Sequence, residues 1–282
     1  MEQLTLPLDQ RPRTRAIPPR AIVVLSGGQD STTCLYWALD LGFQVHAVTF
    51  DYGQRHSREI RAATRIASQA KVQSHEIISA VGLLRGSSPL VSGSPLAQYE
   101  HHSKLPGGLE KTFVPMRNQL FLTIAANRAA VLDAETIITG VCEEDYGGYP
   151  DCRQQFIHAF AHACNLGTFT GENGAPKSIA VLTPLMHLTK AASVRLALDL
   201  EGCYNALSYS HTGYDGKYPP TGKDHATLLR QKGFEEADVP DPLVLRAFHE
   251  NQMDLPSTRN YRPSMVEFVL KKFNLVEYWE NA

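Results

Sequence analysis

The stretch Ala21-Ile22-Val23-Val24-Leu25-Ser26-Gly27-Gly28-Gln29-Asp30-Ser31 decides how this 282-residue chain folds. Its first five residues form an unbroken apolar run, which is typical of a strand buried on both faces of a sheet. Glycines and serines then predict a tight turn, and apolar residues at helical spacing from Thr32 to Leu41 predict a helix that Gly42 closes. Backbone N–H groups and the positive end of the helix dipole meet at such a turn, so it is suited to hold an anion.

The turn lacks the Gly-Lys-Ser/Thr of a Walker loop. An NTPase that transfers the γ-phosphate is therefore disfavoured. The simpler alternative is a structural strand–helix turn in which Asp30 or Ser31 is the N-cap of the helix. The position of the turn after the first strand favours the anion site.

Strand and helix patterns continue to alternate along the chain. Further strands are predicted at 45–50, 75–78, 136–140 and 179–182, and helices at 59–70, 118–132, 154–164 and 190–200. This alternation predicts an α/β fold with a parallel sheet and right-handed crossovers. Residues 84–112 read as an active-site loop or flap, and residues 201–230 show little periodicity. The tail beyond them contains one amphipathic pattern, at 264–273.

Composition excludes several classes of protein. With 43% hydrophobic residues the chain can bury a core, and 27 basic against 29 acidic residues give no positive field for a nucleic-acid backbone. No apolar run approaches the roughly 18 residues of a membrane span, and residues 1–20 lack the apolar stretch of a signal peptide. Five scattered cysteines argue against a disulfide framework. These observations predict a cytoplasmic protein that binds neither membrane nor nucleic acid.

Several ordered motifs carry a resemblance to a known family. The segment SGGQDSTT at 26–33 resembles the SGGxDS loop of the ATP pyrophosphatases, which cleave ATP between its α and β phosphates. Five further segments resemble 7-cyano-7-deazaguanine (preQ0) synthase: DYGQRH at 51–56, FVPMRN at 113–118, TGVCE at 139–143, YPDCR at 149–153, and TPL at 183–185 followed by Lys190. The match runs from about 20 to 200 and continues more weakly to Phe234.

The resemblance implies a Rossmann-like, adenine nucleotide α-hydrolase-like domain over 21–200. A flexible arm over 1–20 and a small irregular or helical region over 201–282 would flank it. It also implies ATP and Mg²⁺ as cofactors, 7-carboxy-7-deazaguanine and ammonia as substrates, and a homodimer. The carboxylate would be adenylated, ammonia would form the amide, and a second ATP would drive formation of the nitrile preQ0.

The resemblance also assigns roles residue by residue. Asp30, Arg117 and Lys190 would be catalytic. The nucleotide would be held by Leu25, Ser26, Gly27, Gly28, Gln29, Asp30, Ser31, Thr32, Tyr52, Gln54 and His56. The substrate would be held by Arg117, Glu143, Asp145, Tyr149, Asp151 and Arg153.

Plainer interpretations of these residues remain open. Arg117 opens a helix, where its charge opposes the helix dipole, so either a bound anion or a salt bridge to Glu143 or Glu144 would compensate it. His56 suits a hydrogen-bonding role better than that of a general base. The polar loop 143–153 is alternatively a solvated acidic loop.

The chain departs from the family where four zinc-binding cysteines are expected. Those positions fall on His211, Thr221, Asp224 and Thr227. Threonine is not an ordinary zinc ligand, so we expect no structural zinc, and a weak site made by His211, Asp224 and His225 is the alternative. This departure keeps open a second function, in which the acyl-adenylate is passed to another amine such as a protein N-terminus, for example in a defence system.

Two further classes of function are alternatives for this sequence. One is a nucleotide-binding relative that does not turn over and acts through a protein partner; it rests only on the missing cysteines and the added ends. The other, a tRNA-thiolating or glutaminase-linked pyrophosphatase, is disfavoured because no CxxC pair or fused glutaminase segment is present.

Overall fold

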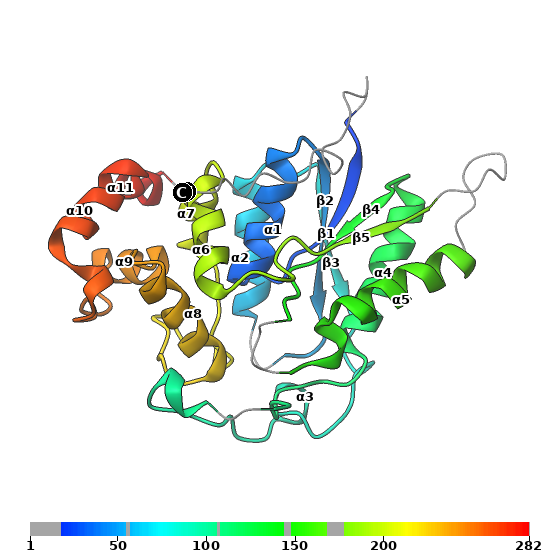
Figure 1. Ribbon diagram of the computed structural model, residues 1–282, viewed down its shortest axis with the longest axis horizontal. Coiled ribbons are helices and arrows are strands. Elements are labelled where there is room, and N and C mark those ends of the chain that lie inside the picture. The colour runs from blue at the N-terminus through cyan, green and yellow to red at the C-terminus, as the bar shows by residue number, and fades with distance from the viewer. Residues whose placement is uncertain (1–17, 55–56, 106–107, 144–147, 168–177, 282) are drawn as a thin grey trace.

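The computed structural model describes residues 18–54, 57–105, 108–143, 148–167 and 178–281. Its centre is a five-stranded parallel sheet with the strand order β3-β2-β1-β4-β5 (Figure 1). The strands are β1 (Arg20–Val24), β2 (Gln44–Asp51), β3 (Ser74–Ser79), β4 (Thr136–Ile138) and β5 (Ala180–Leu182). The structure confirms the predicted parallel sheet and all five of its strands.

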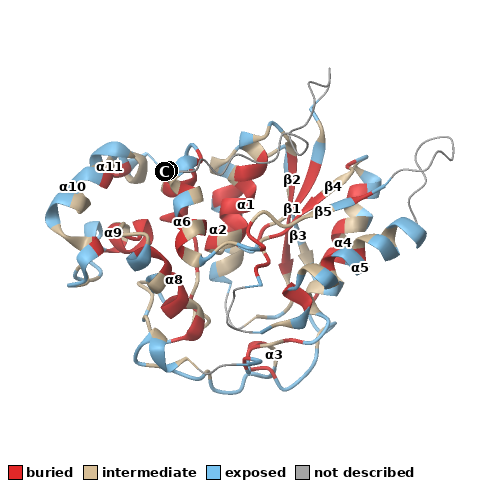
Figure 2. Cartoon of the chain, viewed as in Figure 1, coloured by how far each residue is buried: buried red, intermediate tan, exposed pale blue. Residues whose placement is uncertain are grey.

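The central strand β1 is buried on both faces, as its apolar run predicts. Ala21 and Val23 contribute to one hydrophobic cluster and Ile22 to another, because successive side chains of a strand point to opposite faces. All three are fully buried, and Figure 2 shows the buried residues concentrated along the sheet and the helices beside it. Two layers of helices therefore cover the sheet.

The two helical layers are α1 (Gln29–Asp40), α2 (Arg58–Gln69), α6 (Lys190–Asp199) and α7 (Cys203–Leu207) on one face, and α4 (Arg117–Val131) and α5 (Gln154–Gly167) on the other. Each long helix follows a strand of the sheet in the chain. The amino ends of α1 and α4 consequently lie at the edge where the strands end (Figure 1). This edge carries the candidate site.

The start of α1 differs from the prediction, and the difference affects the candidate site. Helix α1 begins at Gln29 rather than at Thr32, and its N-cap is Gly28, so the alternative with Asp30 or Ser31 as N-cap is wrong. Gly28 has an extended backbone and no side-chain cap is present. Gln29, Asp30 and Ser31 thus form the first helical turn, and their N–H groups belong to the free end of the helix.

The region 84–112 is irregular apart from the short helix α3 (Pro89–Ser92) and a 3₁₀ turn at His102–Lys104. Beyond residue 200 the structure corrects the sequence analysis, because α7, α8 (His225–Glu236), α9 (Pro242–His249) and α11 (Leu275–Glu280) were not predicted. The predicted tail helix is present as α10 (Pro263–Lys272), and a 3₁₀ turn at Arg259–Tyr261 precedes it.

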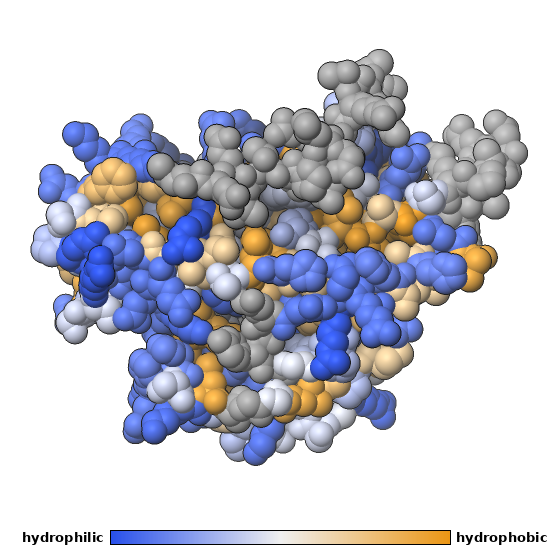
Figure 3. Space-filling view, viewed as in Figure 1, coloured by the Kyte–Doolittle hydropathy of each residue, from blue (hydrophilic) through white to orange (hydrophobic). Residues whose placement is uncertain are grey.

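The carboxyl-terminal helices contribute side chains to the hydrophobic cluster on one face of the sheet. Val269 and Leu275 are fully buried in the cluster that also contains Val23 and Leu35. The proposed division of the chain at 20 and 200 remains a prediction about family organisation. The five cysteines are free thiols. No helix in the described ranges combines the length and apolarity of a membrane span, and the face shown in Figure 3 is mainly hydrophilic with small apolar patches between.

Candidate active site

The site lies where the strand order reverses, between the carboxyl ends of β1 and β4. Open α/β sheets bind ligands in the crevice at such a switch point. Gly140, just after β4, approaches the start of α1 so closely that a Cβ at this position would lie 2.9 Å from backbone atoms of Asp30 and Ser31. The absence of a side chain at Gly140 therefore lets these two segments meet.

A cavity of about 310 Å³ opens at this point. Of the residues that the sequence singles out, it is lined by Leu25, Ser26, Gly28, Gln29, Asp30, Ser31, Tyr52, Gln54, Arg117, Tyr149 and Lys190. These residues come from β1, α1, the end of β2, α4, the 149–152 turn and α6. The sheet edge thus brings together side chains that are far apart in the chain.

The turn at the floor of the cavity is braced by its own serines. The Ser26 and Ser31 hydroxyls are 3.0 Å apart, Ser31 Oγ accepts from the Ser26 N–H, and Ser26 Oγ accepts from the Gly28 N–H. Gly27 has φ = +83°, and a Cβ there would lie 2.4 Å from the Glu59 carbonyl oxygen. Gly27 therefore packs the turn against α2, while the first turn of α1 keeps its N–H groups directed at the cavity.

Asp30 and Lys190 form an ion pair inside the cavity. Lys190 Nζ donates to Asp30 Oδ2 over 2.7 Å, and both side chains are largely buried. Asp30 Oδ1 is buried and has no hydrogen-bond partner among the described residues. One open carboxylate oxygen beside the first turn of α1 suits Mg²⁺, which is commonly held by one or two carboxylates together with substrate phosphates.

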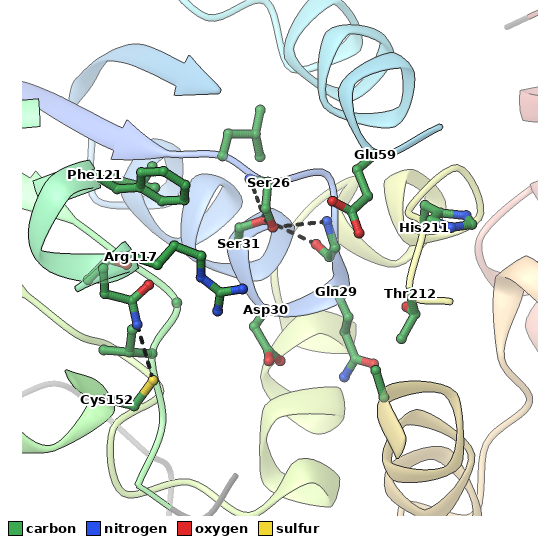
Figure 4. Close-up of a pocket in the computed structure, with 18 of the residues that line it drawn as sticks. Ser26, Gln29, Asp30, Ser31, Glu59, Arg117, Phe121, Cys152, His211 and Thr212 are labelled. Carbon is green, nitrogen blue, oxygen red and sulfur yellow. Dashed lines mark hydrogen bonds between the residues drawn. The ribbon is translucent and has the colours of Figure 1, made fainter. Parts of the chain in front are cut away.

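Arg117 and Glu59 face the same space from opposite sides (Figure 4). Arg117 is the first residue of α4, as predicted, and its side chain hydrogen-bonds to Tyr52. Burial raises the pKa of Glu59 to about 7, although the nearby Arg117 charge acts to lower it. Near neutral pH the Glu59 carboxyl in this cavity is therefore partly protonated. The Arg117 guanidinium stays positively charged, and its charge suits an anion.

Aromatic rings form one wall of the cavity. Phe50 and Phe121 are stacked with their centroids 4.2 Å apart and their planes within 2°, and Tyr52 lies 5.6 Å from Phe121. Burial raises the pKa of Tyr52 to about 12, so its phenol stays protonated. A flat heterocycle can stack on such a wall.

The remaining predicted residues take other positions. The buried Thr32 hydroxyl donates to the Gly28 carbonyl, and Arg153 is exposed. Glu143 accepts from the Gln154 N–H at the start of α5, and Asp151 accepts from the Asn118 N–H near the start of α4. Burial raises the pKa of Asp151. With Gly27, none of these lines the cavity; His56, Asp145 and Glu144 lie outside the described residues.

Several cavity residues were not foreseen. They are Glu59, Phe121, His211, Thr212, Tyr214 and His225. The clearest missed signal is Glu59, an acidic residue in the first turn of a predicted helix that directly follows the Asp51–His56 motif. His211 reaches the site because its N–H donates to the Gly27 carbonyl over 2.8 Å, a tertiary contact that no local pattern predicts.

The four positions that align with zinc cysteines are bound within the protein. His211 Nε2 is 2.7 Å from the Gly213 carbonyl, and the Thr221 hydroxyl donates to Asp215. Asp224 is the N-cap of α8, where its Oδ1 accepts from the Thr227 N–H. Among the described residues, no three His, Cys, Asp or Glu side chains are placed to hold a metal ion.

Comparisons with known proteins agree with the motifs. A family model described as queuosine biosynthesis protein QueC matches residues 20–238. The 7-cyano-7-deazaguanine synthase of Gloeobacter violaceus is 48% identical over 226 residues, 79% of this chain and 95% of the relative. That of Chromobacterium violaceum is 44% identical over 240 residues, 84% of this chain and 98% of the relative. Among solved structures, a 4-thiouridine synthetase–RNA complex with bound ATP is 15% identical with a TM-score of 0.42, covering 91% of this chain and 53% of that one. The chain therefore belongs to the QueC family and is an ATP-dependent enzyme of that family.

Proposed function

We propose that the enzyme uses ATP and ammonia to convert the carboxylate of 7-carboxy-7-deazaguanine into the nitrile of preQ0. The observation that carries this proposal is the single cavity in which the α1 turn, Lys190, Arg117 and an aromatic wall converge. The relatives named 7-cyano-7-deazaguanine synthase, aligned over nearly their full length, supply the substrate class.

ATP would lie with its β and γ phosphates on the α1 turn. The N–H groups of the first helical turn and the Lys190 ammonium would neutralise these phosphates, and Asp30 would hold Mg²⁺ through Oδ1, which is buried without a hydrogen-bond partner among the described residues. The ion would supply further neutralisation of the departing pyrophosphate charge. The Arg117 guanidinium would then hydrogen-bond to the substrate carboxylate and position it next to the α-phosphate.

In the first half of the reaction, a carboxylate oxygen attacks the α-phosphorus and the bond to the bridging oxygen of pyrophosphate breaks. Ammonia then bonds to the acyl carbon, AMP leaves with the electron pair of the broken C–O bond, and the nitrogen releases a proton. In the second half, the amide oxygen attacks a second ATP in the same way. Loss of AMP and of two N–H protons leaves the nitrile. Alignment and charge neutralisation, not a covalent enzyme intermediate, do this work.

The deazaguanine ring would stack on the aromatic wall. Phe121 and Tyr52 present its surface, and Tyr149 and the protonated Glu59 offer polar groups at its rim. The roles predicted for Glu143, Asp145, Asp151 and Arg153 remain predictions, as does that of His56.

Incubation with ATP, 7-carboxy-7-deazaguanine and ammonium chloride tests the proposal. AMP and pyrophosphate should appear in step with product, and the product mass should be that of preQ0. ADP and phosphate as the main nucleotide products would overturn it. A product mass showing another amine joined to the acyl group would assign the second function, conjugation, to the same adenylating site.

A further inference from the structure

A second cavity, of about 280 Å³, lies beside the candidate active site. One wall comes from the 89–112 segment, which runs below the edge where the strands end (Figure 1), and the other from the start of α8. The Tyr99 N–H donates to the Lys223 carbonyl over 2.7 Å and holds the two walls together. We call this space the flap chamber.

Two buried carboxylates face the flap chamber. Glu110 and Asp224 are each 5% exposed. Asp224 Oδ2 is buried and has no hydrogen-bond partner among the described residues, and Glu110 Oε1 accepts from the Tyr99 hydroxyl over 3.3 Å. No lysine or arginine in the described part of the chain forms an ion pair with either one. Lys111 also lines the chamber, but it is an exposed residue and forms no such pair. Buried carboxylates without a bound lysine or arginine are costly unless a proton or a ligand supplies the charge.

The flap chamber adjoins the active-site cavity directly. Tyr214 and His225 line both spaces, so these side chains form the partition. His225 Nε2 is 3.9 Å from Glu110 Oε1. A second connection is the hydrogen bond of 2.7 Å between the Thr112 hydroxyl, which faces the chamber, and the Tyr149 hydroxyl, which faces the cavity. The side chains of Tyr214 and His225 therefore separate a small molecule held in the chamber from the active-site cavity.

We propose that the flap chamber binds the nitrogen source of the reaction as a cation, either ammonium or the ammonium group of a small primary amine. Before attack the cation gives one proton to the Asp224 or Glu110 carboxylate, and the neutral nitrogen then uses its lone pair to bond to the acyl carbon. This inference rests on the proposed function, because it names the site from which the second substrate is supplied. Asp224 Oδ2 and the Glu110 carboxylate accept its N–H groups and balance its charge. The described carboxylates and histidines are not grouped for a metal ion, so hydrogen-bond donors on a single cation suit the chamber better.

Steady-state kinetics on the full chain tests the site with Asp224→Asn and Glu110→Gln. Asparagine is also a good N-cap, and glutamine can still accept from Tyr99, so both variants keep the local structure. Loss of one charge-assisted hydrogen bond should raise the KM for ammonium about tenfold or more, with kcat and the KM for ATP within twofold of the unsubstituted enzyme. Glu76→Gln is the matched control; its carboxylate pairs with Arg128 on the surface, and its KM for ammonium should not change.

ATP–pyrophosphate exchange without ammonium separates the two proposals. Exchange dependent on the deazaguanine acid should persist in both variants, because adenylation precedes entry of the nucleophile. Absence of exchange in the unsubstituted enzyme would refute the proposed function. Normal exchange together with a KM for ammonium that rises less than fivefold in both variants, or with a fall in kcat alone, would refute the flap-chamber site. A parallel series with glycinamide, read by product mass, shows which amine source the chamber serves.

Discussion

Asp30 and Lys190 join the starts of α1 and α6 at the candidate site. They are 160 positions apart in the chain, yet their side chains pair over 2.7 Å at the starts of α1 and α6. We predict that Asp30→Asn lowers turnover by two to three orders of magnitude, because it removes the charge that orients Lys190 and the oxygen suited to Mg²⁺. The rate of pyrophosphate release measures this effect.

Asp40→Asn is the matched control for that prediction. Asp40 is exposed in the last turn of the same helix, where a negative charge opposes the helix dipole. Its substitution should leave turnover unchanged and raise stability slightly. Equal activity of the Asp30 and Asp40 variants would remove Asp30 from the catalytic group.

Glu59 predicts a dependence of stability on pH. Burial raises its pKa from about 4.5 in the unfolded chain to about 7, so between these values the folded state binds more protons. The stabilising contribution is complete below pH 4.5 and is lost as pH rises through 7. Glu59→Gln should therefore match the unsubstituted protein near pH 4.5 and exceed its unfolding free energy by about 1–3 kcal/mol at pH 8.5.

Urea unfolding at both pH values measures the difference. Glu201→Gln, at an exposed position, serves as control and should give parallel values at both. A Glu59→Gln variant less stable than the unsubstituted protein at pH 8.5 would mean that the attraction between the Glu59 and Arg117 charges outweighs the cost of burying Glu59.

Local sequence cues placed the turn after β1 at the candidate site, because the strand, the turn and the helix that form it are contiguous; that the turn binds phosphate stays a prediction. Glu59 and His211 escaped such cues, since their places depend on how α2 and the segment after α7 pack against Gly27. Residue roles that arise from one segment are predictable from sequence. Roles that arise from a contact between segments need the fold.

At the scale of elements, Gly27 shows how one turn and one helix depend on each other. Its φ of +83° resembles the +78° of Gly42, but a Cβ at Gly27 would lie 2.4 Å from the backbone of α2, whereas one at Gly42 meets nothing within 4 Å. We predict that Gly27→Ala lowers the unfolding free energy by about 3 kcal/mol or more and that Gly42→Ala costs about 1 kcal/mol. Denaturant unfolding of both variants checks the difference, and equal losses would show that α2 moves away freely.

Most strands of the sheet were predictable as elements because they are short apolar runs between turn residues; β3, which contains His75 and Glu76, is the exception. Helix α8 was not, although Asp224 caps it. Its buried side includes Arg230 and Gly233 beside Leu228 and Phe234, so apolar residues do not recur at helical spacing. Arg230 is tolerated there because it forms a buried ion pair with Asp241, in the segment that follows. Because a polar network replaces apolar residues on the buried side of α8, the hydrophobic pattern of the sequence does not reveal this helix.

Taken as a whole, the molecule carries its carboxyl-terminal helices as an outer layer, packed on the helices that cover one face of the sheet (Figure 1). Tyr204 of α7 lies 4.4 Å from Phe273, Asn205 donates to the Phe273 carbonyl, and Tyr278 donates to Gln69 of α2. The segment aligned with the zinc cysteines is held by hydrogen bonds of its own and by the Arg230–Asp241 pair. These contacts can replace a metal as the source of folding free energy for the region after residue 200.

The last prediction follows from that replacement. Deleting residues 263–282 removes Val269 and Leu275, both fully buried in the core shared with β1, while it leaves the Arg230–Asp241 pair in place. Burying two such side chains is worth about 3–6 kcal/mol, so the melting temperature should fall by about 10 °C or more. Deletion of residues 1–17 is the control and should lower the melting temperature by a smaller amount. Treatment with a chelator, followed by its removal and the return of Mg²⁺, should leave melting and pyrophosphate release unchanged, because we expect far less than one zinc per chain. One tightly held zinc per chain, together with a shortened protein that melts normally, would show that a metal stabilises this region after all and that His211, Asp224 and His225 rearrange to hold it.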